Sequence, residues 1–266
     1  MCIRDSPYDM SSKVKKDIID MTTKLALELN VVGLINLQFA VKDNEVYVLE
    51  VNPRSSRTVP FVSKYSNVPL ANIAAQLSVG RKISDFNLNE NRFKHTAVKK
   101  AVLPFKKFKD EKVFLGPEMK STGEVMGIDT EPGIAFLKAM QSDGYTVPRS
   151  GTAFVSITDV DKKRALPIIK DLQKLNFTII ATKGTAEFLL ENNINCSPVF
   201  KVGEGRPNVV DEILNDNIHL VINTPQGAQS RYDEEAIGKT SVMKNVLTIT
   251  TFAGAKAAIE AMSNLN

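Results

Sequence analysis

Gln38 and Glu50 stand within two runs of apolar and β-branched residues, 34–41 and 46–51, and Asn52 directly follows the second run. All three side chains carry oxygen atoms. The runs are separated by Lys-Asp-Asn-Glu, whose central pair tolerates the positive φ of a tight reversal. This pattern predicts a β-hairpin that brings Gln38 near Glu50 and Asn52, which are two residues apart and so face the same side of a strand. Amide and carboxylate oxygens are hard donors that suit Mg²⁺, whose remaining positions are filled by water and substrate phosphates.

Two arginines, Arg54 and Arg57, follow the second run directly. A planar guanidinium binds two phosphate oxygens at once, so arginine suits phosphate recognition better than lysine does. A set of metal ligands that leads into two arginines predicts half of a nucleoside-triphosphate site. The spacing alone is equally compatible with a hairpin whose polar end is merely solvated.

A second group of polar residues follows the predicted strands of the C-terminal half. From residue 152 onward, short apolar runs alternate with amphipathic segments, which predicts βαβ units and a parallel sheet. Ligands of such sheets lie beyond the carboxyl ends of the strands. The Thr-Lys-Gly-Thr run at 182–185 opens a predicted helix whose N–H groups suit an anion; alone it would be read as an ordinary helix cap, but several strand ends converge here. The predicted phosphate pocket comprises Ser156, Lys162, Thr182, Thr185, Lys201 and Asn223.

Further elements are needed to support the hairpin. A helix is predicted over 11–30, where serine stands at the start and apolar residues recur at spacings of three to four. Prolines at 60 and 69 frame a predicted loop, and a helix is predicted at 70–79.

The middle of the chain predicts an irregular loop at 116–127, because glycine and proline are frequent there, and then a helix at 131–140. The polar run 141–151 has the composition of a linker and predicts a domain boundary. Beyond it, strands are predicted at 153–157, 177–181, 197–201, 220–223 and 246–250. Helices are predicted at 161–176, 185–193, 207–217, 233–239 and 253–263.

Composition and charge limit the class of protein. The 266 residues are 43% hydrophobic and carry a net charge of +4, which is enough chain for one large or two ordinary domains with a mixed surface. No apolar run approaches the roughly 20 residues of a membrane span, and no basic face with aromatic platforms indicates a nucleic-acid partner. Cys2 and Cys196 form no metal or disulfide pattern, which favours a reducing cytoplasm. His95 and His219 have no partner motif and predict no catalytic role.

The hairpin motif resembles the metal-binding end of the ATP-grasp fold, through Glu-Val-Asn-Pro-Arg at 50–54 with Gln38 before it. The longer run at 50–64, EVNPRSSRTVPFVSK, is similar to the large subunit of carbamoyl-phosphate synthetase, and in particular to its second, carbamate-phosphorylating half. Two further runs, VLPFKKF at 102–108 and LGPEMKSTGEVMG at 115–127, resemble the same half. The resemblance covers nearly the whole chain from residue 7.

The last third of the chain resembles the methylglyoxal-synthase-like regulatory domain that ends this subunit. The implied fold class is α/β, with an α+β ATP-grasp portion followed by a Rossmann-like parallel-sheet domain. The corresponding boundaries are 7–140 for the C-terminal part of the ATP-grasp domain, 141–151 for the linker and 152–266 for the regulatory domain.

The resemblance implies an ATP-dependent carbon–nitrogen ligase, a glutamine-hydrolysing carbamoyl-phosphate synthase of pyrimidine and arginine biosynthesis. Gln38, Glu50 and Asn52 would hold Mg²⁺ or Mn²⁺ on the phosphates of ATP. Arg54 would steady the transferring group, and Arg57 is a further candidate for that task. A small glutaminase subunit and the rest of the large subunit are the implied partners. Because the adenine pocket, the lid and the other synthetase half are not visible in this sequence, the chain alone is expected to be inactive.

The resemblance also implies regulation. In bacterial members the C-terminal domain binds UMP as an inhibitor and IMP as an activator, which carries a phosphate-binding role to the predicted pocket. Pro225 stands where a second hydroxyl is expected, and this leaves the identity of the effector open. Lys99 and Lys100 stand where an acidic ligand is expected in ornithine-activated members, which argues against ornithine. No carboxylate within 182–185 is placed to act as a base, so we expect binding rather than methylglyoxal synthesis.

Two other functions remain open on the sequence. One is a stand-alone nucleotide-binding regulatory module formed by 152–266, and the other is a different ATP-grasp ligase that shares the metal ligands. The second does not explain RTVPFVSK or the appended domain. Residues 1–6, MCIRDS, match nothing expected of the family; they are interpreted as a foreign leader or a gene-model error, which leaves open whether Met1 is a genuine start.

Overall fold

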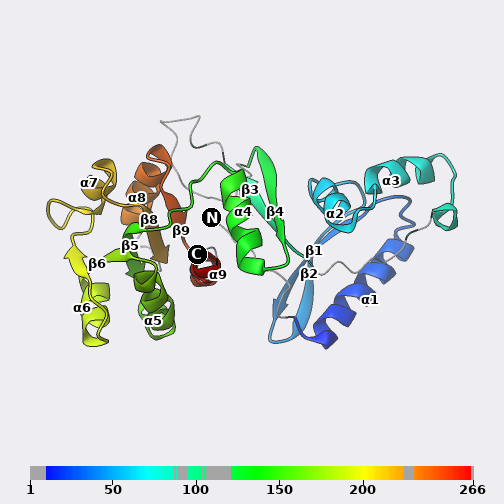
Figure 1. Ribbon diagram of the computed structural model, residues 1–266. Coiled ribbons are helices and arrows are strands. Elements are labelled where there is room, and N and C mark those ends of the chain that lie inside the picture. Colours follow the sequence, from blue (N-terminus) through cyan, green and yellow to red (C-terminus); the bar gives the residue numbers. More distant parts are fainter. Residues whose placement is uncertain are drawn as a thin grey trace. The chain divides into compact units, whose positions relative to one another are not determined.

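The computed structural model describes residues 10–86, 88, 95–103, 105, 121–224 and 231–264. They belong to two compact units, an N-terminal unit within Asp5–Lys94 and a C-terminal unit that contains His95–Asn266 (Figure 1). Residues 1–6, Pro225 and most of 104–120, with parts of the motifs quoted above, lie outside the described residues. Among the described helices, none combines the length and the apolar character that crossing a membrane requires.

The N-terminal unit contains the hairpin and the helix that contacts it. Helix α1 (Ser12–Glu28) is capped by the hydroxyl of Ser11, which accepts a hydrogen bond from the backbone N–H of Val14 at 3.3 Å. Strands β1 (Asn36–Lys42) and β2 (Glu45–Asn52) pair antiparallel, and α1 contacts both. Asp43 and Asn44 have φ values of 53° and 61°, as a tight two-residue hairpin turn requires. The predicted helix at 11–30 and the predicted hairpin are both confirmed.

A helix stands where the sequence predicts a loop. Helix α2 (Thr58–Ser66) follows the hairpin, and α3 (Leu70–Ser78) follows as predicted, with a short 3₁₀ helix, η2 (Ile83–Asp85), after it. The loop prediction was wrong because Pro60 lies in the first turn of α2, where its missing N–H removes no intrahelical hydrogen bond. Among the described residues of this unit, only Val14 and Ile73 are buried apolar side chains.

The C-terminal unit begins with a two-stranded sheet and a helix. Strand β3 (Thr96–Val102) pairs antiparallel with β4 (Gly123–Asp129), and α4 (Pro132–Ser142) packs on both. A Cβ at Gly127 would lie 1.9 Å from the carbonyl oxygen of Ala135, so only glycine permits this approach of strand and helix. The irregular loop predicted at 116–127 is therefore wrong from Gly123 onward, since Gly127 marks a close contact and not a turn.

A buried ion pair joins β3 to the end of α4. The ammonium of Lys100 contacts the carboxylate of Asp143, and the two side chains are 8% and 12% exposed. Lys100 Nζ lies 5.3 Å from the ring centre of Tyr145. Burial, helped by the charge of Asp143, raises the pKa of Tyr145 to about 12. A pair this buried needs both partners, because loss of one leaves an uncompensated charge.

Five parallel strands form the larger sheet, in the order β7–β6–β5–β8–β9, which confirms the predicted α/β fold. The strands are β5 (Gly151–Ile157), β6 (Phe177–Thr182), β7 (Ser197–Val199), β8 (Leu220–Thr224) and β9 (Leu247–Ile249). The helices are α5 (Asp159–Lys174), α6 (Lys183–Glu191), α7 (Val209–Leu214), α8 (Arg231–Met243) and α9 (Phe252–Asn264). The chain moves outward from β5 to β7 and returns to β8 on the other side of β5, so the order reverses between β5 and β8.

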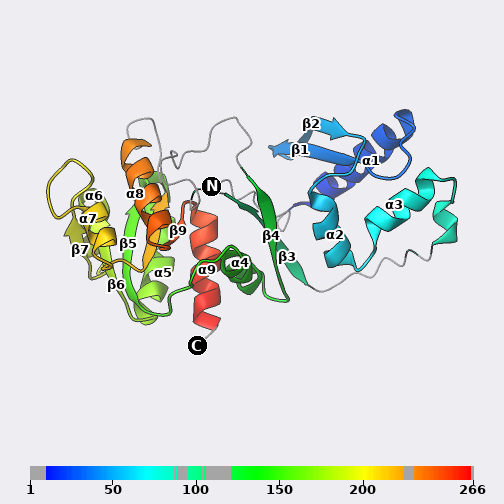
Figure 2. The same ribbon diagram turned by 90° about the horizontal axis from the view of Figure 1, so that it is seen from above.

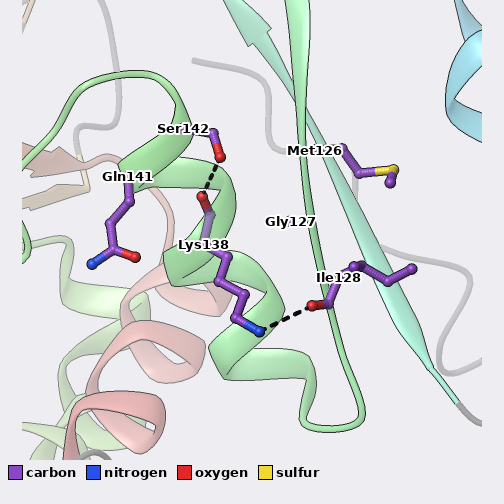
Figure 3. Close-up of a pocket in the computed structure, with 6 residues that line it drawn as sticks. All are labelled: Met126, Gly127, Ile128, Lys138, Gln141 and Ser142. Carbon is purple, nitrogen blue, oxygen red and sulfur yellow. Dashed lines mark hydrogen bonds between the residues drawn. The ribbon is translucent and has the colours of Figure 1, made fainter. Parts of the chain in front are cut away.

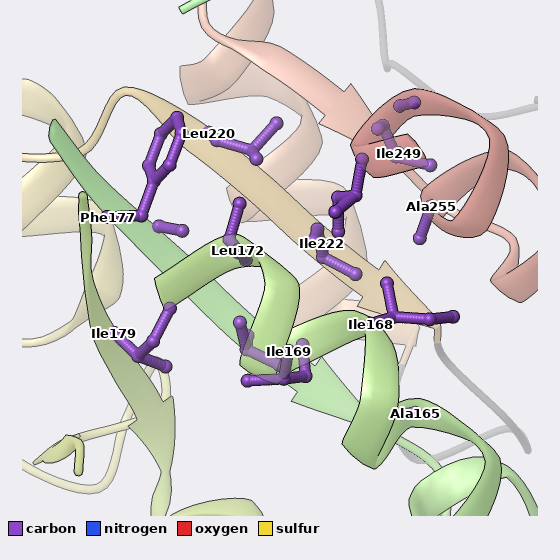
Figure 4. Packing of buried hydrophobic residues seen from close by; sticks show 14 of the residues in the cluster. Ala165, Ile168, Ile169, Leu172, Phe177, Ile179, Leu220, Ile222, Ile249 and Ala255 are labelled. Atoms are coloured by element: carbon purple, nitrogen blue, oxygen red, sulfur yellow. The ribbon is translucent and has the colours of Figure 1, made fainter. Parts of the chain in front are cut away.

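Each face of this sheet has its own apolar core, because successive strand side chains point to opposite faces. On one face Ile169 and Leu172 of α5 belong to a cluster with Ile179 and Ile222 of the strands, which α6 and α9 also join (Figure 4).

On the other face Phe154 and Val221 form a smaller cluster with Ile213 of α7 and Ile237 of α8. Helices α7 and α8 therefore cover the face opposite to α5 and α6 (Figure 1).

Helix α4 belongs to the larger core as well. Its Leu137 and Met140 are each 2% exposed and join the cluster that contains Ala261 of α9. A Cβ at Gly133 would lie 2.6 Å from the carbonyl oxygen of Ala257, so α4 and α9 touch almost through their backbones (Figure 2). The residues predicted as a linker, 141–151, thus connect elements that share one core, and the boundary itself stays a prediction.

Candidate functional sites

The hairpin brings the predicted metal ligands to one face of the strands. Gln38 lies opposite Glu50, and Asn36 lies opposite Asn52. Directly opposed side chains of an antiparallel pair are neighbours, so amide and carboxylate oxygens gather here. The side chain of Glu50 is exposed to solvent. Asn36 was missed in the sequence, although its spacing of two from Gln38 could have indicated it.

A β-bulge precedes the glutamate. The partners of Gln38 and Phe39 are Glu50 and Val48, so Leu49 is an extra residue on β2. Bulges of this kind bend a strand and change the direction of its side chains, and they occur often beside functional sites. The bulge lies before Glu50, so the two-residue spacing from Glu50 to Asn52 still keeps both on one face.

Arg54 is held beside Asn52. Its guanidinium donates from Nη2 to Asn52 Oδ1 at 3.2 Å and from Nη1 to the carbonyl of Ser55 at 2.9 Å. An amide oxygen has two lone pairs, so Asn52 Oδ1 can accept from the arginine and still offer one pair to a cation. Arg57 is exposed and occupies the position before the first residue of α2.

The donor set fits a hard divalent cation. One carboxylate and two amides supply part of an oxygen shell and leave positions for water and phosphate oxygens, the arrangement that Mg²⁺ favours. Within the described ranges, no three His, Cys, Asp or Glu side chains cluster in a way that could hold a metal ion. The residues therefore suit a cation that a phosphate substrate completes.

A cavity of about 130 Å³ opens at the carboxyl ends of the parallel strands, where the strand order reverses. This is about the volume of four liquid waters, enough for a phosphate group. Four of the six predicted phosphate ligands line it, namely Ser156, Thr182, Lys201 and Asn223. Their role as ligands stays a prediction.

The other two predicted ligands do not line the cavity. The hydroxyl of Thr185 is engaged: Thr185 Oγ1 accepts from the backbone N–H of Ile157 and from the hydroxyl of Thr182, both at 3.3 Å. Lys162 Nζ donates to the carbonyl of Gly184 at 2.8 Å. The side chains of Thr185 and Lys162 therefore hold the loop that opens α6 in place.

Three polar residues of the cavity are additional to the predicted set, namely Thr158, Thr224 and Asp233. Thr224 Oγ1 accepts from the backbone N–H of Thr158 at 3.3 Å and so ties β8 to β5. Burial raises the pKa of Asp233; the nearby charge of Lys201 opposes this and that of Glu204 adds to it. Thr224 follows Asn223 at a strand end that the sequence itself indicates, and Thr158 adjoins a strand end and could have been found in the same way. Asp233 comes from α8 and carries no such signal.

A shallower hollow of about 440 Å³ lies between β4 and α4 (Figure 3). Met126, Gly127 and Ile128 line one side. From α4, Lys138 reaches across and donates to the carbonyl of Ile128 at 3.3 Å and to the carboxylate of Asp129 at 2.6 Å. Because its ammonium is already matched by acceptors of the chain, this hollow shows no arrangement that indicates a ligand.

Both lysines that bear on ornithine regulation are paired within the chain. Lys99 lies 3.3 Å from the carboxylate of Glu124, and Lys100 pairs with Asp143 as described above. The absence of ornithine regulation stays a prediction.

Two family models match the chain. Residues 6–86 match the family described as carbamoyl-phosphate synthase L chain, ATP binding domain, and residues 164–250 match the MGS-like domain. Together they cover more than half of the chain. The first match includes the whole hairpin site, and the second includes all of the cavity residues except those that precede α5.

Relatives with the same name extend the match to nearly the whole chain. It is 49% identical over 258 residues to the carbamoyl phosphate synthase large chain of Archaeoglobus fulgidus, which covers 96% of this chain and 24% of that protein. It is 46% identical over 278 residues to the large chain, C-terminal section, of Aquifex aeolicus, which covers 97% of this chain and 51% of that protein. The chain thus spans about a quarter to a half of the length of these curated relatives. It belongs to the carbamoyl phosphate synthase large-chain family, as a C-terminal region with an ATP-binding part and an MGS-like domain.

Proposed function

We propose that the chain contributes the metal-binding hairpin of the carbamate-phosphorylating site to a glutamine-hydrolysing carbamoyl phosphate synthase, together with an effector domain. The observation that supports this most strongly is the register of β1 and β2, in which Gln38 faces Glu50 while Asn52 shares their side and contacts Arg54. These are hard oxygen donors next to a phosphate-binding group.

The roles of the residues follow from their chemistry. A bound Mg²⁺ or Mn²⁺ would neutralise charge on the phosphates of ATP. Gln38, Glu50 and Asn52 would hold that cation through their oxygens, and Glu50 supplies the negative charge among them. Arg54 would donate to the transferring phosphoryl group, whose charge builds on its outer oxygens. Arg57 is the second candidate donor.

The rest of the reaction requires other parts of the enzyme. We propose that the remainder of the large chain supplies the adenine pocket and the lid, and that a small glutaminase subunit supplies ammonia. The chain on its own would then form no carbamoyl phosphate. The mature enzyme would act in the cytoplasm, in pyrimidine and arginine synthesis.

The cavity of the parallel sheet is the proposed effector site, with UMP and IMP as the candidate ligands. Lys201, Thr182 and Asn223 line it, and Lys162 and Thr185 stand at the loop that opens α6. A helix N-terminus with hydroxyls and lysines nearby suits a phosphate group. Residues 7–140, 141–151 and 152–266 remain the proposed domain boundaries.

A hybrid enzyme tests both sites together. The matching 258-residue stretch of the Archaeoglobus fulgidus large chain would be replaced by this chain, and carbamoyl phosphate would be measured from ATP, bicarbonate and ammonia. Glu50→Gln should lower kcat by about 100-fold or more, because charge stabilisation of a transferring group is lost. Lys201→Ala should leave kcat near that of the hybrid but remove its response to UMP or IMP.

The matched control is Glu45→Gln, which removes an exposed carboxylate from the other end of β2. It should keep full activity. Activity that survives Glu50→Gln would contradict the metal role, and synthesis by the 266-residue chain alone would contradict the need for the other parts. A hybrid that responds to UMP equally with and without Lys201 would refute the effector site.

A further inference from the structure

The ammonium of Lys162 already has two partners in the chain. Nζ donates to the carbonyl of Gly184 at 2.8 Å and lies 2.7 Å from the carboxylate of Asp159. Lys162 and Asp159 belong to the first turn of α5, and Gly184 to that of α6. The lysine therefore spans two helix starts. An ammonium has three N–H donors, so one remains for a further acceptor.

The two partners of Lys162 differ in charge. The carbonyl of Gly184 is neutral and orients the lysine. Asp159 carries a full negative charge on a side chain that is 91% exposed, whereas the Lys162 side chain is 16% exposed. The hydrogen bond and the charge of Lys162 lower the pKa of Asp159, so this carboxylate is ionised at neutral pH. Any anion that binds Lys162 must share it with a like charge.

The ammonium lies beside the loop that the proposed phosphate would use. Gly184 stands between Thr182 and Thr185, whose hydroxyls are hydrogen-bonded to each other. Thr182 also lines the cavity. A phosphate held there by Lys162 would meet the carboxylate of Asp159 as well.

We infer that Asp159 sets the affinity of the effector site, because its carboxylate competes with the phosphate group of a nucleotide for the ammonium of Lys162. The inference rests on the proposed nucleotide site. It assigns Asp159 a role that opposes binding: the residue keeps the affinity below the value that the remaining groups of the pocket would give.

Titration calorimetry of the 266-residue chain with UMP and with IMP tests the inference. Asp159→Asn keeps the size and an acceptor oxygen for Lys162 but removes the charge. Its Kd for the nucleotide that the wild type binds should fall about two- to fivefold, the range for one exposed ion pair. The gain should shrink at high salt, since exposed charges are screened. Lys162→Met should weaken binding and abolish the difference between Asp and Asn at position 159.

Asp171→Asn is the matched control. Asp171 lies on the same helix and pairs in the same i, i+3 manner with Lys174, at 2.7 Å, but near the other end of α5. It should leave Kd unchanged. An equal gain in this control would assign the effect to net charge and overturn the inference.

The remaining outcomes separate the inference from the proposed site. If the wild type and Asp159→Asn bind a nucleotide with equal Kd, the inference fails and the site stands. Weaker binding by Asp159→Asn also refutes competition, because it would mean that Asp159 positions Lys162 for the ligand. If neither protein binds UMP or IMP, the proposed effector site fails and the inference fails with it.

Discussion

Asp233 of helix α8 lines the cavity at the carboxyl ends of the parallel strands. Its folded-state pKa is raised above the ordinary value of 3.8, chiefly by burial. The folded protein therefore holds this proton more tightly than the unfolded chain does. The bound proton of Asp233 therefore stabilises the folded state fully at pH values below the ordinary pKa, and this stabilisation is lost as pH rises through the folded-state pKa. At neutral pH the ionised carboxylate lowers the stability of the protein.

Asp233→Asn should consequently raise Tm at neutral pH and have little effect below pH 3.8. Thermal unfolding followed by circular dichroism across this pH range provides the measurement. Glu234→Gln, the next residue of the same first turn, controls for the loss of an acid near a helix start. A Tm for Asp233→Asn at neutral pH that is no higher than that of the control would contradict the prediction.

At the residue scale, local chemistry could be predicted and distant chemistry could not. The approach of Gln38 to Glu50 could be predicted because a two-residue turn folds the two strands against each other. The turn alone would place Gln38 opposite Leu49, and the bulge that places it opposite Glu50 has no signal in the sequence. Asp233 could not be assigned to the cavity because α8 comes to the strand ends only through the fold. The engagement of Lys162 with Asp159 depends on a rotamer, which spacing does not determine.

The contact between β4 and α4 depends on the absence of a side chain at one position. A Cβ at Gly127 would lie 1.9 Å from the carbonyl oxygen of Ala135 and 2.5 Å from the backbone nitrogen of Ala139. Backbone atoms in a helix cannot move aside singly. The whole of α4 would have to shift, and α4 also packs on α9.

Gly127→Ala should therefore lower the free energy of unfolding of the C-terminal unit by about 2–3 kcal/mol, as overpacking does. Gly123→Ala is the matched control, because it lies on the same strand and its added Cβ would meet no atom within 4 Å. It should stay within about 1 kcal/mol of the wild type. Urea denaturation measures the free energy of unfolding of both variants. Equal values for the two would contradict the prediction, because they would mean that α4 can shift to accommodate the added methyl group.

At the element scale, the errors arose where one residue type has two uses. Pro60 predicts a loop, but proline is equally suited to the first turn of a helix. Gly127 predicts part of a turn, but a glycine in a strand also permits the close approach of a neighbouring element. Only the packing partner distinguishes these uses, and it lies elsewhere in the sequence.

At the scale of the whole molecule, the alternation of strands and helices from residue 152 predicts the parallel sheet correctly. Alternation does not give the strand order, which depends on where the chain returns after β7. The N-terminal unit has few buried apolar side chains among its described residues. A unit with so few buried apolar side chains gains little stability from burial by itself.

The core shared by α4 and α9 decides where the MGS-like domain could be cut out of the chain. A polypeptide of residues 152–264 would lack α4, so α9 would present to water the surface that now packs against Gly133, Leu137 and Met140. A polypeptide of residues 95–264 would keep that surface covered. We expect the shorter piece to self-associate and to bind an apolar dye, and the longer piece to remain monomeric in analytical ultracentrifugation. A monomeric, dye-free piece of residues 152–264 would contradict this. An MGS-like domain transplanted from this chain into another enzyme would therefore have to bring β3, β4 and α4 with it.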